Sequence, residues 1–139
     1  MRDKFQVLVV NQDSNTAVAW QTALERAGYH VMRASHAAKA FERLEATHID
    51  AMIVEQQLSD MSGEVLTQVA RERWPQLRVV LHTAADGQQL GLRNDAQVQL
   101  LSRPPTARTL KARLERLLPE VAAAPVWRVR LAPERASAR

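Results

Sequence analysis

Short apolar runs alternate along this chain with longer stretches in which apolar residues recur at helical spacing. Each apolar run is predicted to form a strand: Phe5–Val10, Tyr29–Ala34, Ala51–Val54, Leu77–His82 and Val98–Leu101. Some of these runs contain only apolar residues, a pattern typical of strands that are buried on both faces of a sheet. The pattern therefore predicts a parallel sheet that is covered by helices on both sides.

Helices are predicted in the stretches between the strands, with ends set by capping residues and by helix breakers such as Gly28 and Pro75. The first helix is predicted to begin at Ser14 or Asn15, the second to cover Ser35–Thr47, and the third to begin at Ser62 or Gly63. The fourth, at Leu90–Arg93, is predicted to be short and weak, and the fifth follows Thr106. Helical spacing predicts these inward-facing residues: Val18, Leu24 and Ala27, then Ala37, Ala40, Phe41 and Leu44, then Val65, Leu66 and Val69, and finally Leu110, Leu114, Leu117 and Leu118.

Five strand–helix cycles are complete by Pro119, and this alternation predicts right-handed crossovers in a doubly wound α/β sheet. A chain of 139 residues has room for one such domain, over residues 1–118, followed by a tail or linker over residues 119–139. There is no cysteine, which excludes disulfides and thiolate sites. No apolar run has the length of a signal peptide or a bilayer span, so we expect a cytoplasmic protein.

The net charge of +4 is spread along the chain. Residues 1–118 carry 15 basic and 13 acidic side chains, and the last 21 residues carry four and two. Because no dense basic face is visible, we expect the domain itself to bind neither nucleic acid nor a membrane. Binding of nucleic acid or anionic lipid by the basic tail is a weaker alternative.

Polar residues follow four of the five predicted strands, where a doubly wound sheet has its functional crevice. They are Asn11-Gln12-Asp13, Glu55, Thr83 and Arg103-Pro104. From about Phe5 to Leu118 this layout resembles a bacterial response-regulator receiver domain, the phospho-acceptor module of two-component signalling. The resemblance implies a flavodoxin-like (βα)5 sheet with strand order 2-1-3-4-5.

The chain departs from that family at most of the positions that carry its chemistry. The family has an acidic pair that holds magnesium, an aspartate that is phosphorylated, a Ser or Thr, an aromatic switch residue and a Lys-Pro pair. By the resemblance, the corresponding residues here are Asn11 and Gln12, Glu55, Thr83, Leu100, and Arg103 with Pro104. The resemblance therefore implies a degenerate form of the domain, a pseudo-receiver.

Loss of the acidic pair removes the anionic oxygens that magnesium prefers, so we expect neither tight magnesium binding nor any other cofactor. Asp13 is predicted to cap or solvate its loop. Glu55 is one methylene longer than aspartate, and we do not expect it to be phosphorylated. Two interpretations of Glu55 stay open: its carboxylate imitates the phosphorylated state near Thr83 and Arg103, or it forms only a structural ion pair with Arg103.

Other candidate sites have weaker patterns. The four histidines, His30, His36, His48 and His82, lack metal-ligand spacing and are interpreted as surface or packing residues. No nucleophile elbow or phosphate-binding glycine loop is present, so we do not expect an enzyme.

We expect the chain to act by phosphorylation-independent binding, either to another signalling protein or to a second copy of itself. The resemblance indicates a surface on the fourth helix, fifth strand and fifth helix, which includes Leu90, Leu92, Arg93, Arg108, Lys111, Ala112 and Glu115. Charge reversal at Lys111 or Glu115 is expected to weaken self-association in sedimentation experiments, and an unchanged mass would exclude this surface as the interface.

An alternative interpretation makes the domain the N-terminal regulatory part of a longer response regulator that still responds to phosphate. The alanines and prolines near Glu120–Pro125 would then begin a linker to a DNA-binding or cyclic-dinucleotide output domain. Trp127 lies in this tail, either as an anchor for a partner or packed back on its own domain.

Overall fold

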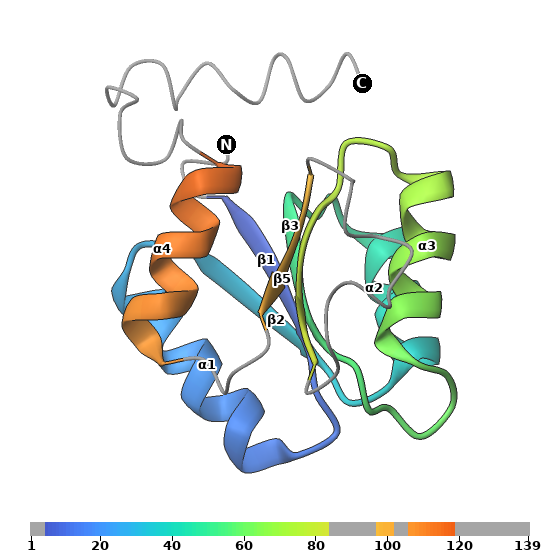
Figure 1. Ribbon diagram of the computed structural model, residues 1–139, viewed down its shortest axis with the longest axis horizontal. Helices are drawn as coiled ribbons and strands as arrows, with labels where there is room; N and C mark the ends of the chain where they lie inside the picture. The colour runs from blue at the N-terminus through green and yellow to red at the C-terminus, as the bar shows by residue number, and fades with distance from the viewer. Residues whose placement is uncertain (1–4, 84–96, 102–105, 119–139) are drawn as a thin grey trace.

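Five parallel strands form the central sheet in the computed structural model, which describes residues 5–83, 97–101 and 106–118. The strands are β1 (Gln6–Val10), β2 (His30–Ala34), β3 (Ala51–Glu55), β4 (Arg78–His82) and β5 (Val98–Leu101). Their order in the sheet is β2-β1-β3-β4-β5 (Figure 1). The predicted parallel sheet and its strand order are confirmed.

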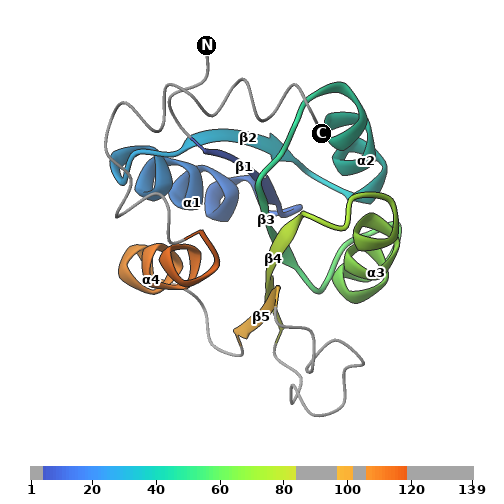
Figure 2. The same cartoon turned by 90° about the horizontal axis from the view of Figure 1, so that it is seen from above.

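Four described helices cover the two faces of the sheet: α1 (Ser14–Arg26), α2 (Ala37–Ala46), α3 (Gly63–Arg73) and α4 (Ala107–Leu117). α1 and α4 lie on one face, and α2 and α3 lie on the other (Figure 2). None of these helices has the length and apolar character needed to span a membrane. The weak helix predicted at Leu90–Arg93 and the tail at 119–139 fall outside the described residues.

The core consists of two apolar layers, one on each face of the sheet. The inner strands β1 and β3 contribute to both layers, because residues 7–10 and 51–54 are completely buried. On one face they pack against Trp20 and Leu24 of α1 and Leu110 and Leu114 of α4. This burial on both sides explains why the strands read as continuous apolar runs.

The end of α1 is a Schellman motif, as the stop signal at Gly28 predicts. Gly28 has φ of 102°, its N–H donates to the Glu25 carbonyl, and the next residue, Tyr29, donates to the Leu24 carbonyl. A residue with a Cβ is strained at this φ, so the glycine allows the chain to turn from α1 into β2. The start of α1 differs from the prediction, because Asp13 occupies the N-cap position in place of Ser14 or Asn15.

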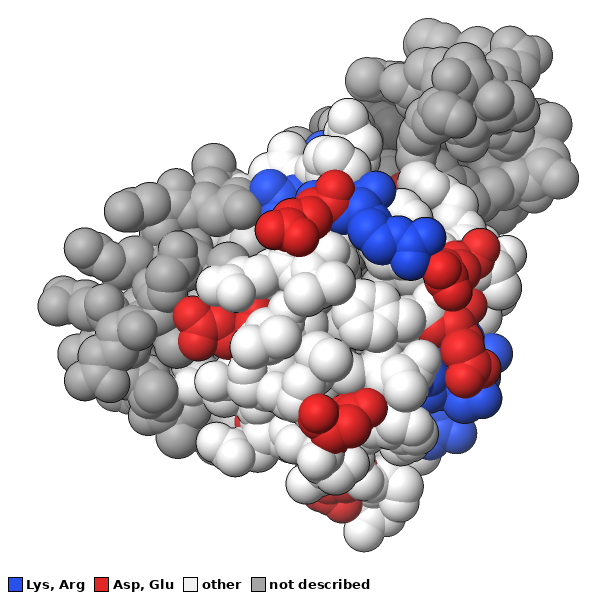
Figure 3. All heavy atoms as spheres, turned by 90° about the vertical axis from the view of Figure 1, so that its right-hand side faces the viewer, with Lys and Arg blue, Asp and Glu red and all other residues white. Residues whose placement is uncertain are grey.

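The predicted inward faces of α1 and α3 need correction at three valines. Val18 is 45% exposed, Val65 43% and Val69 38%. On α3, Leu66 is buried as predicted, and the other buried residues are Gly63, Thr67 and Ala70. On this side of the molecule, acidic and basic residues surround a central uncharged area (Figure 3). The Thr67 hydroxyl donates to the Gly63 carbonyl within the helix, at 2.8 Å, which allows a polar residue to occupy a buried position.

Candidate functional site

The loop after β1 is held by the side chain of Asn11. This residue is only 5% exposed, and its Oδ1 accepts the Asp13 N–H at 2.9 Å. Its own N–H donates to the Ala34 carbonyl, which extends the pairing of β1 with β2 by one step. Gln12 and Asp13 are exposed, and the Asp13 carboxylate accepts the hydroxyl of Thr16 in the first turn of α1. Asp13 is the N-cap residue of α1, and its carboxylate binds the helix through Thr16 and not through a backbone N–H.

Glu55 at the end of β3 is paired with His82 at the end of β4. Oε1 of Glu55 lies 2.8 Å from Nδ1 of His82, and the two side chains are 18% and 17% exposed. The parallel register places these residues directly opposite each other. Oε2 of Glu55 accepts the Gln57 N–H at 3.3 Å, so both carboxylate oxygens have partners. A half-buried carboxylate is thereby satisfied within the protein.

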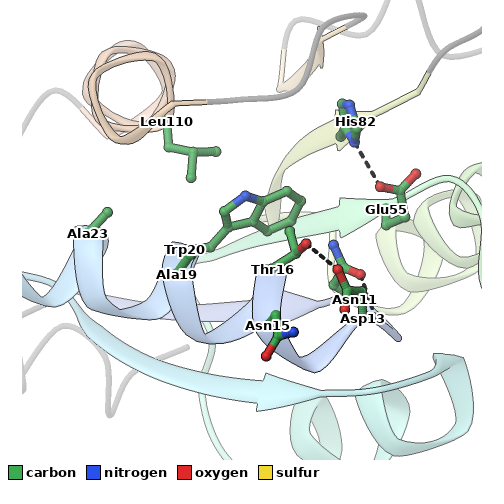
Figure 4. Close-up of a pocket in the computed structure, with 10 residues that line it drawn as sticks. All are labelled: Asn11, Asp13, Asn15, Thr16, Ala19, Trp20, Ala23, Glu55, His82 and Leu110. Atoms are coloured by element: carbon green, nitrogen blue, oxygen red, sulfur yellow. Dashed lines mark hydrogen bonds and ion pairs between the residues drawn. The ribbon is translucent and has the colours of Figure 1, made fainter.

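The His82 ring is also fixed on its other side. It packs edge-on against the indole of Trp20, with ring centroids 6.2 Å apart and an interplanar angle of 86°. Trp20 itself is 5% exposed and belongs to the core between α1 and the sheet. Glu55, His82 and Trp20 therefore form a connected series from the sheet edge to the core, which we call the Glu55–His82–Trp20 cluster (Figure 4).

A cavity of about 650 Å³ lies beside this cluster, between α1 and α4. Its polar lining residues include Glu55, His82, Asn11 and Asp13, and its apolar lining residues are Ala19, Trp20, Ala23 and Leu110 (Figure 4). Its position at the carboxyl ends of β1, β3 and β4 is the place where ligands bind in sheets of this type. Residues that follow β1 and residues at the ends of β3 and β4 thus line one cavity.

Of the remaining predicted site residues, the structure describes Thr83 and Leu100 but not Arg103 and Pro104. Thr83 is buried and donates its N–H to the Leu101 carbonyl, and Leu100 is half-buried against the core on the α2 and α3 side. Arg103 and Pro104 lie outside the described residues, and with them the expected Glu55–Arg103 pair.

Asp60, in the loop after β3, caps a neighbouring helix. Its two carboxylate oxygens accept the N–H groups of Ala37 and Ala38 at 2.9 Å each, at the start of α2. These backbone hydrogen bonds lower the pKa of the Asp60 carboxyl below its ordinary value of 3.8. α2 consequently begins at Ala37, two residues later than predicted from Ser35, because its cap comes from a distant loop.

Replacing Asp60 by alanine is expected to lower the free energy of unfolding by about 1 kcal/mol at neutral pH, the usual effect of losing a helix cap. Because folding lowers the Asp60 pKa, its contribution is complete above pH 3.8 and is lost as the pH falls below that value. Urea unfolding of Asp60→Ala and the unchanged protein, followed from neutral pH to about pH 3, should show the two converging. If the difference in unfolding free energy between the two proteins stays constant over this pH range, the Asp60 carboxylate does not act as the cap.

The described part of the predicted interaction surface lies on one side of α4, the helix predicted after Thr106. Arg108, Lys111 and Ala112 are exposed, whereas Glu115 is half-buried. Burial of Tyr29 and, to a smaller extent, the negative charge of Glu115 raise the pKa of Tyr29 to about 12. On the other side, Arg113 donates to Oε1 of Gln99 on β5 at 2.9 Å. Leu90, Leu92 and Arg93 fall outside the described residues.

Comparison with known proteins identifies the family. The family model of the response regulator receiver domain matches residues 7–115. The chain belongs to this family. A response regulator receiver protein from Brucella abortus (strain 2308), CpdR, is 29% identical over 115 residues, which are 81% of this chain and 96% of the relative. The receiver domain thus assigns the chain to two-component signalling, as the resemblance implied.

Solved receiver structures share the fold at low sequence identity. A CheY-like receiver domain from Methanospirillum hungatei JF-1 has a TM-score of 0.77 at 20% identity, over 88% of this chain and 99% of that one. TrrA from Thermotoga maritima, solved in complex with Mg²⁺ and BeF, has a TM-score of 0.73 at 20% identity, over 82% and 99% of the two chains. These likenesses confirm the doubly wound receiver fold.

His82 is the site residue that the sequence interpretation missed. In the sequence interpretation it is a surface or packing histidine, because the four histidines show no short metal-ligand spacing. The available signal was different: Glu55 and His82 are the last residues of two adjacent parallel strands, and residues at matched strand ends lie side by side. In this receiver, register and not spacing creates the contact.

Proposed function

We propose that this receiver domain acts in two-component signalling without being phosphorylated, by binding a protein, and that it has no enzymatic activity. The observation that carries the proposal is the Glu55–His82 hydrogen bond of 2.8 Å. By the family resemblance, Glu55 stands where other receivers have the phospho-acceptor aspartate. Here that carboxylate is already engaged, through both of its oxygens, by groups of the protein itself.

The residues near Glu55 also do not suit the magnesium ion that the family implies. Magnesium prefers several oxygen ligands in octahedral geometry, among them carboxylates. At the positions of the acidic pair this chain has the amides of Asn11 and Gln12, and Oδ1 of Asn11 is occupied by the Asp13 N–H. Over the described residues, no group of three or more His, Asp or Glu side chains comes together to hold a metal.

Phosphoryl transfer depends on positioning and on neutralising charge around the transferred group. Both requirements are weakened here, because the acidic pair is replaced by amides and the carboxylate is one methylene longer and bound to His82. The same contacts favour one fixed arrangement of the crevice. A receiver with a fixed crevice can still present a binding surface, and the exposed side of α4 with Arg108, Lys111 and Ala112 is the candidate.

Amide NMR spectra recorded during titration with magnesium and then with beryllium fluoride, a mimic of the acyl phosphate, test the proposal. We expect the resonances of Asn11, Asp13, Glu55 and Thr83 to stay in place through both additions. The Thermotoga TrrA receiver, which has been solved with Mg²⁺ and BeF, is the positive control under the same conditions. Resonance shifts clustered at these residues would show that this chain binds magnesium and the phosphate mimic as phosphate-responsive receivers do, and would contradict the proposal.

A variant with Asn11→Asp, Gln12→Asp and Glu55→Asp serves as a matched control within this chain. It restores the carboxylates that the family uses and shortens the side chain that reaches His82. We expect magnesium-dependent shifts in this variant and not in the unchanged protein, because the two added carboxylates provide the anionic oxygens that magnesium prefers. Equal responses of the two proteins would show that the acidic pair is not what separates them.

A further inference from the structure

A second groove lies on the far side of Asn11 from the Glu55–His82–Trp20 cluster, at the edge of the sheet where β1 and β2 end. Its volume is about 390 Å³, within the range of small-ligand sites. α1 and α2 both begin at this edge, on opposite faces of the sheet (Figures 1 and 2). The described residues that line it are Asn11, Gln12, Ser14, Ala17, Arg33, Ala34, Ser35, Lys39 and Arg43, and we call this the β1–β2 groove.

Three cationic side chains line the β1–β2 groove, and none of the described lining residues carries a carboxylate. Arg33 comes from β2, and Lys39 and Arg43 come from α2. The Nε–H of Arg43 donates to the Arg33 carbonyl at 3.3 Å, which places the Arg43 side chain across the end of β2. The two Nη groups of Arg43 can then donate to other groove residues or to a ligand. The guanidinium groups of two arginines offer planar pairs of donors that match phosphate oxygens.

Only one of these cations has an acidic partner among the described residues. Lys39 Nζ lies 3.2 Å from Glu42, and the two side chains are 43% and 67% exposed, so solvent screens this ion pair. Arg33 is exposed and forms no ion pair with a described carboxylate. The groove therefore carries a local excess of positive charge that the domain does not neutralise.

The remaining lining adds room and further donors. Ala17 and Ala34 are small and buried, so nothing bulky fills the centre of the groove. Ser14 is exposed at the start of α1 and adds a hydroxyl, while the carboxylate of the N-cap residue, Asp13, accepts the Thr16 hydroxyl. The side chains of Gln12 and Ser35 are exposed and add neutral hydrogen-bonding groups.

We propose that the β1–β2 groove binds a small ligand with two or more phosphate charges, through Arg33, Lys39 and Arg43. A single weakly charged anion would leave most of this positive charge unpaired, whereas a diphosphate carries enough negative charge to pair with several cations. Among the described residues no aromatic side chain lines the groove to stack a base, so the diphosphate itself carries recognition. The receiver would then respond to a soluble phosphorylated ligand at a site separate from Glu55.

Calorimetric titration of the full chain with inorganic pyrophosphate and with ADP, at physiological salt, tests this site. Arg33→Gln and Arg43→Gln are each expected to weaken pyrophosphate binding about tenfold or more, as the loss of a charge-assisted contact predicts. Arg73→Gln is the matched control, because Arg73 is exposed, pairs with Glu45, does not line the groove, and carries the same charge. If pyrophosphate and ADP bind with equal affinity, the diphosphate alone is recognised. If ADP binds more tightly, the nucleoside also contacts the protein.

Two outcomes would overturn the proposal. If Arg73→Gln weakens binding as much as the groove variants, the effect comes from net charge and not from a site. If pyrophosphate and ADP leave the amide resonances of Ser14, Arg33 and Ser35 unshifted while an oligonucleotide shifts them, the surface binds nucleic acid instead. Because resonance shifts in the unchanged protein locate the ligand directly, the result does not depend on how well the variants fold.

Discussion

Replacing Gly63 by alanine is expected to destabilise the domain by about 2 to 3 kcal/mol. A Cβ at Gly63 would lie 2.5 Å from the backbone carbonyl oxygen of Glu55 and 2.9 Å from Cδ1 of Leu81. The first contact is with main chain at the end of β3, which cannot rotate away as a side chain can. Either the start of α3 or the end of β3 must move, and Glu55 moves with it.

This prediction opposes the one from helix propensity. Gly63 is the first residue of α3, and exchanging glycine for alanine in a helix normally stabilises it, by up to about 1 kcal/mol. Urea unfolding followed by tryptophan fluorescence measures the sign directly. Gly28→Ala is the control, since nothing lies within 4 Å of its Cβ and only its φ of 102° opposes the change. A Gly63→Ala protein as stable as the original would contradict the close approach.

The sheet was predictable because the sequence requirement for a buried parallel strand is strong and local. Strands with an apolar residue at almost every position, such as Val7–Val10 and Ala51–Val54, have no polar face to present to solvent. The end of α1 was predictable for the same kind of reason, because Gly28 adopts a positive φ that other residues avoid. In both cases one short segment contains all the information.

The helix faces were less predictable, because the phase of a helix depends on the surface it packs against. Val65 and Val69 are apolar, yet the small residues Gly63 and Ala70 together with Thr67 face the sheet. Gly63 has to be on that side, because its N–H donates to the Gln56 carbonyl and no larger residue fits beside Glu55. The close approach of α3 to the end of β3 therefore fixes the helix phase against its apolar pattern.

In the candidate site, too, some features were predictable from the sequence and others were not. The residues that follow the strands were located from the sequence, because all parallel strands end at one edge of the sheet. The partners were not, since the Glu55–His82 contact joins residues 27 positions apart and the cap on α2 comes from Asp60, 23 positions after Ala37. Such contacts depend on the register between segments, which neither segment encodes alone.

Breaking the Glu55–His82 pair is expected to have the second largest effect on stability. Glu55→Ala should lower the free energy of unfolding by about 2 kcal/mol at neutral pH, because a half-buried charge-assisted hydrogen bond is lost and the His82 ring loses its partner. Glu55→Asp should lose nearly as much, since shortening the side chain by one methylene withdraws the carboxylate from Nδ1. Urea unfolding of both variants measures these changes.

A double-mutant cycle separates the pair from the rest of its surroundings. With Glu55→Ala, His82→Ala and the combined variant, we expect a coupling free energy of about 1 kcal/mol or more. The cycle on Glu45 and Arg73 is the matched control: those atoms are also 2.8 Å apart, but the side chains are 53% and 56% exposed, so coupling should stay below about 0.5 kcal/mol. Equal coupling in the two cycles would mean that burial does not strengthen the Glu55–His82 bond. The Glu55 carboxylate would then be held too weakly to support the proposal that this receiver acts without being phosphorylated.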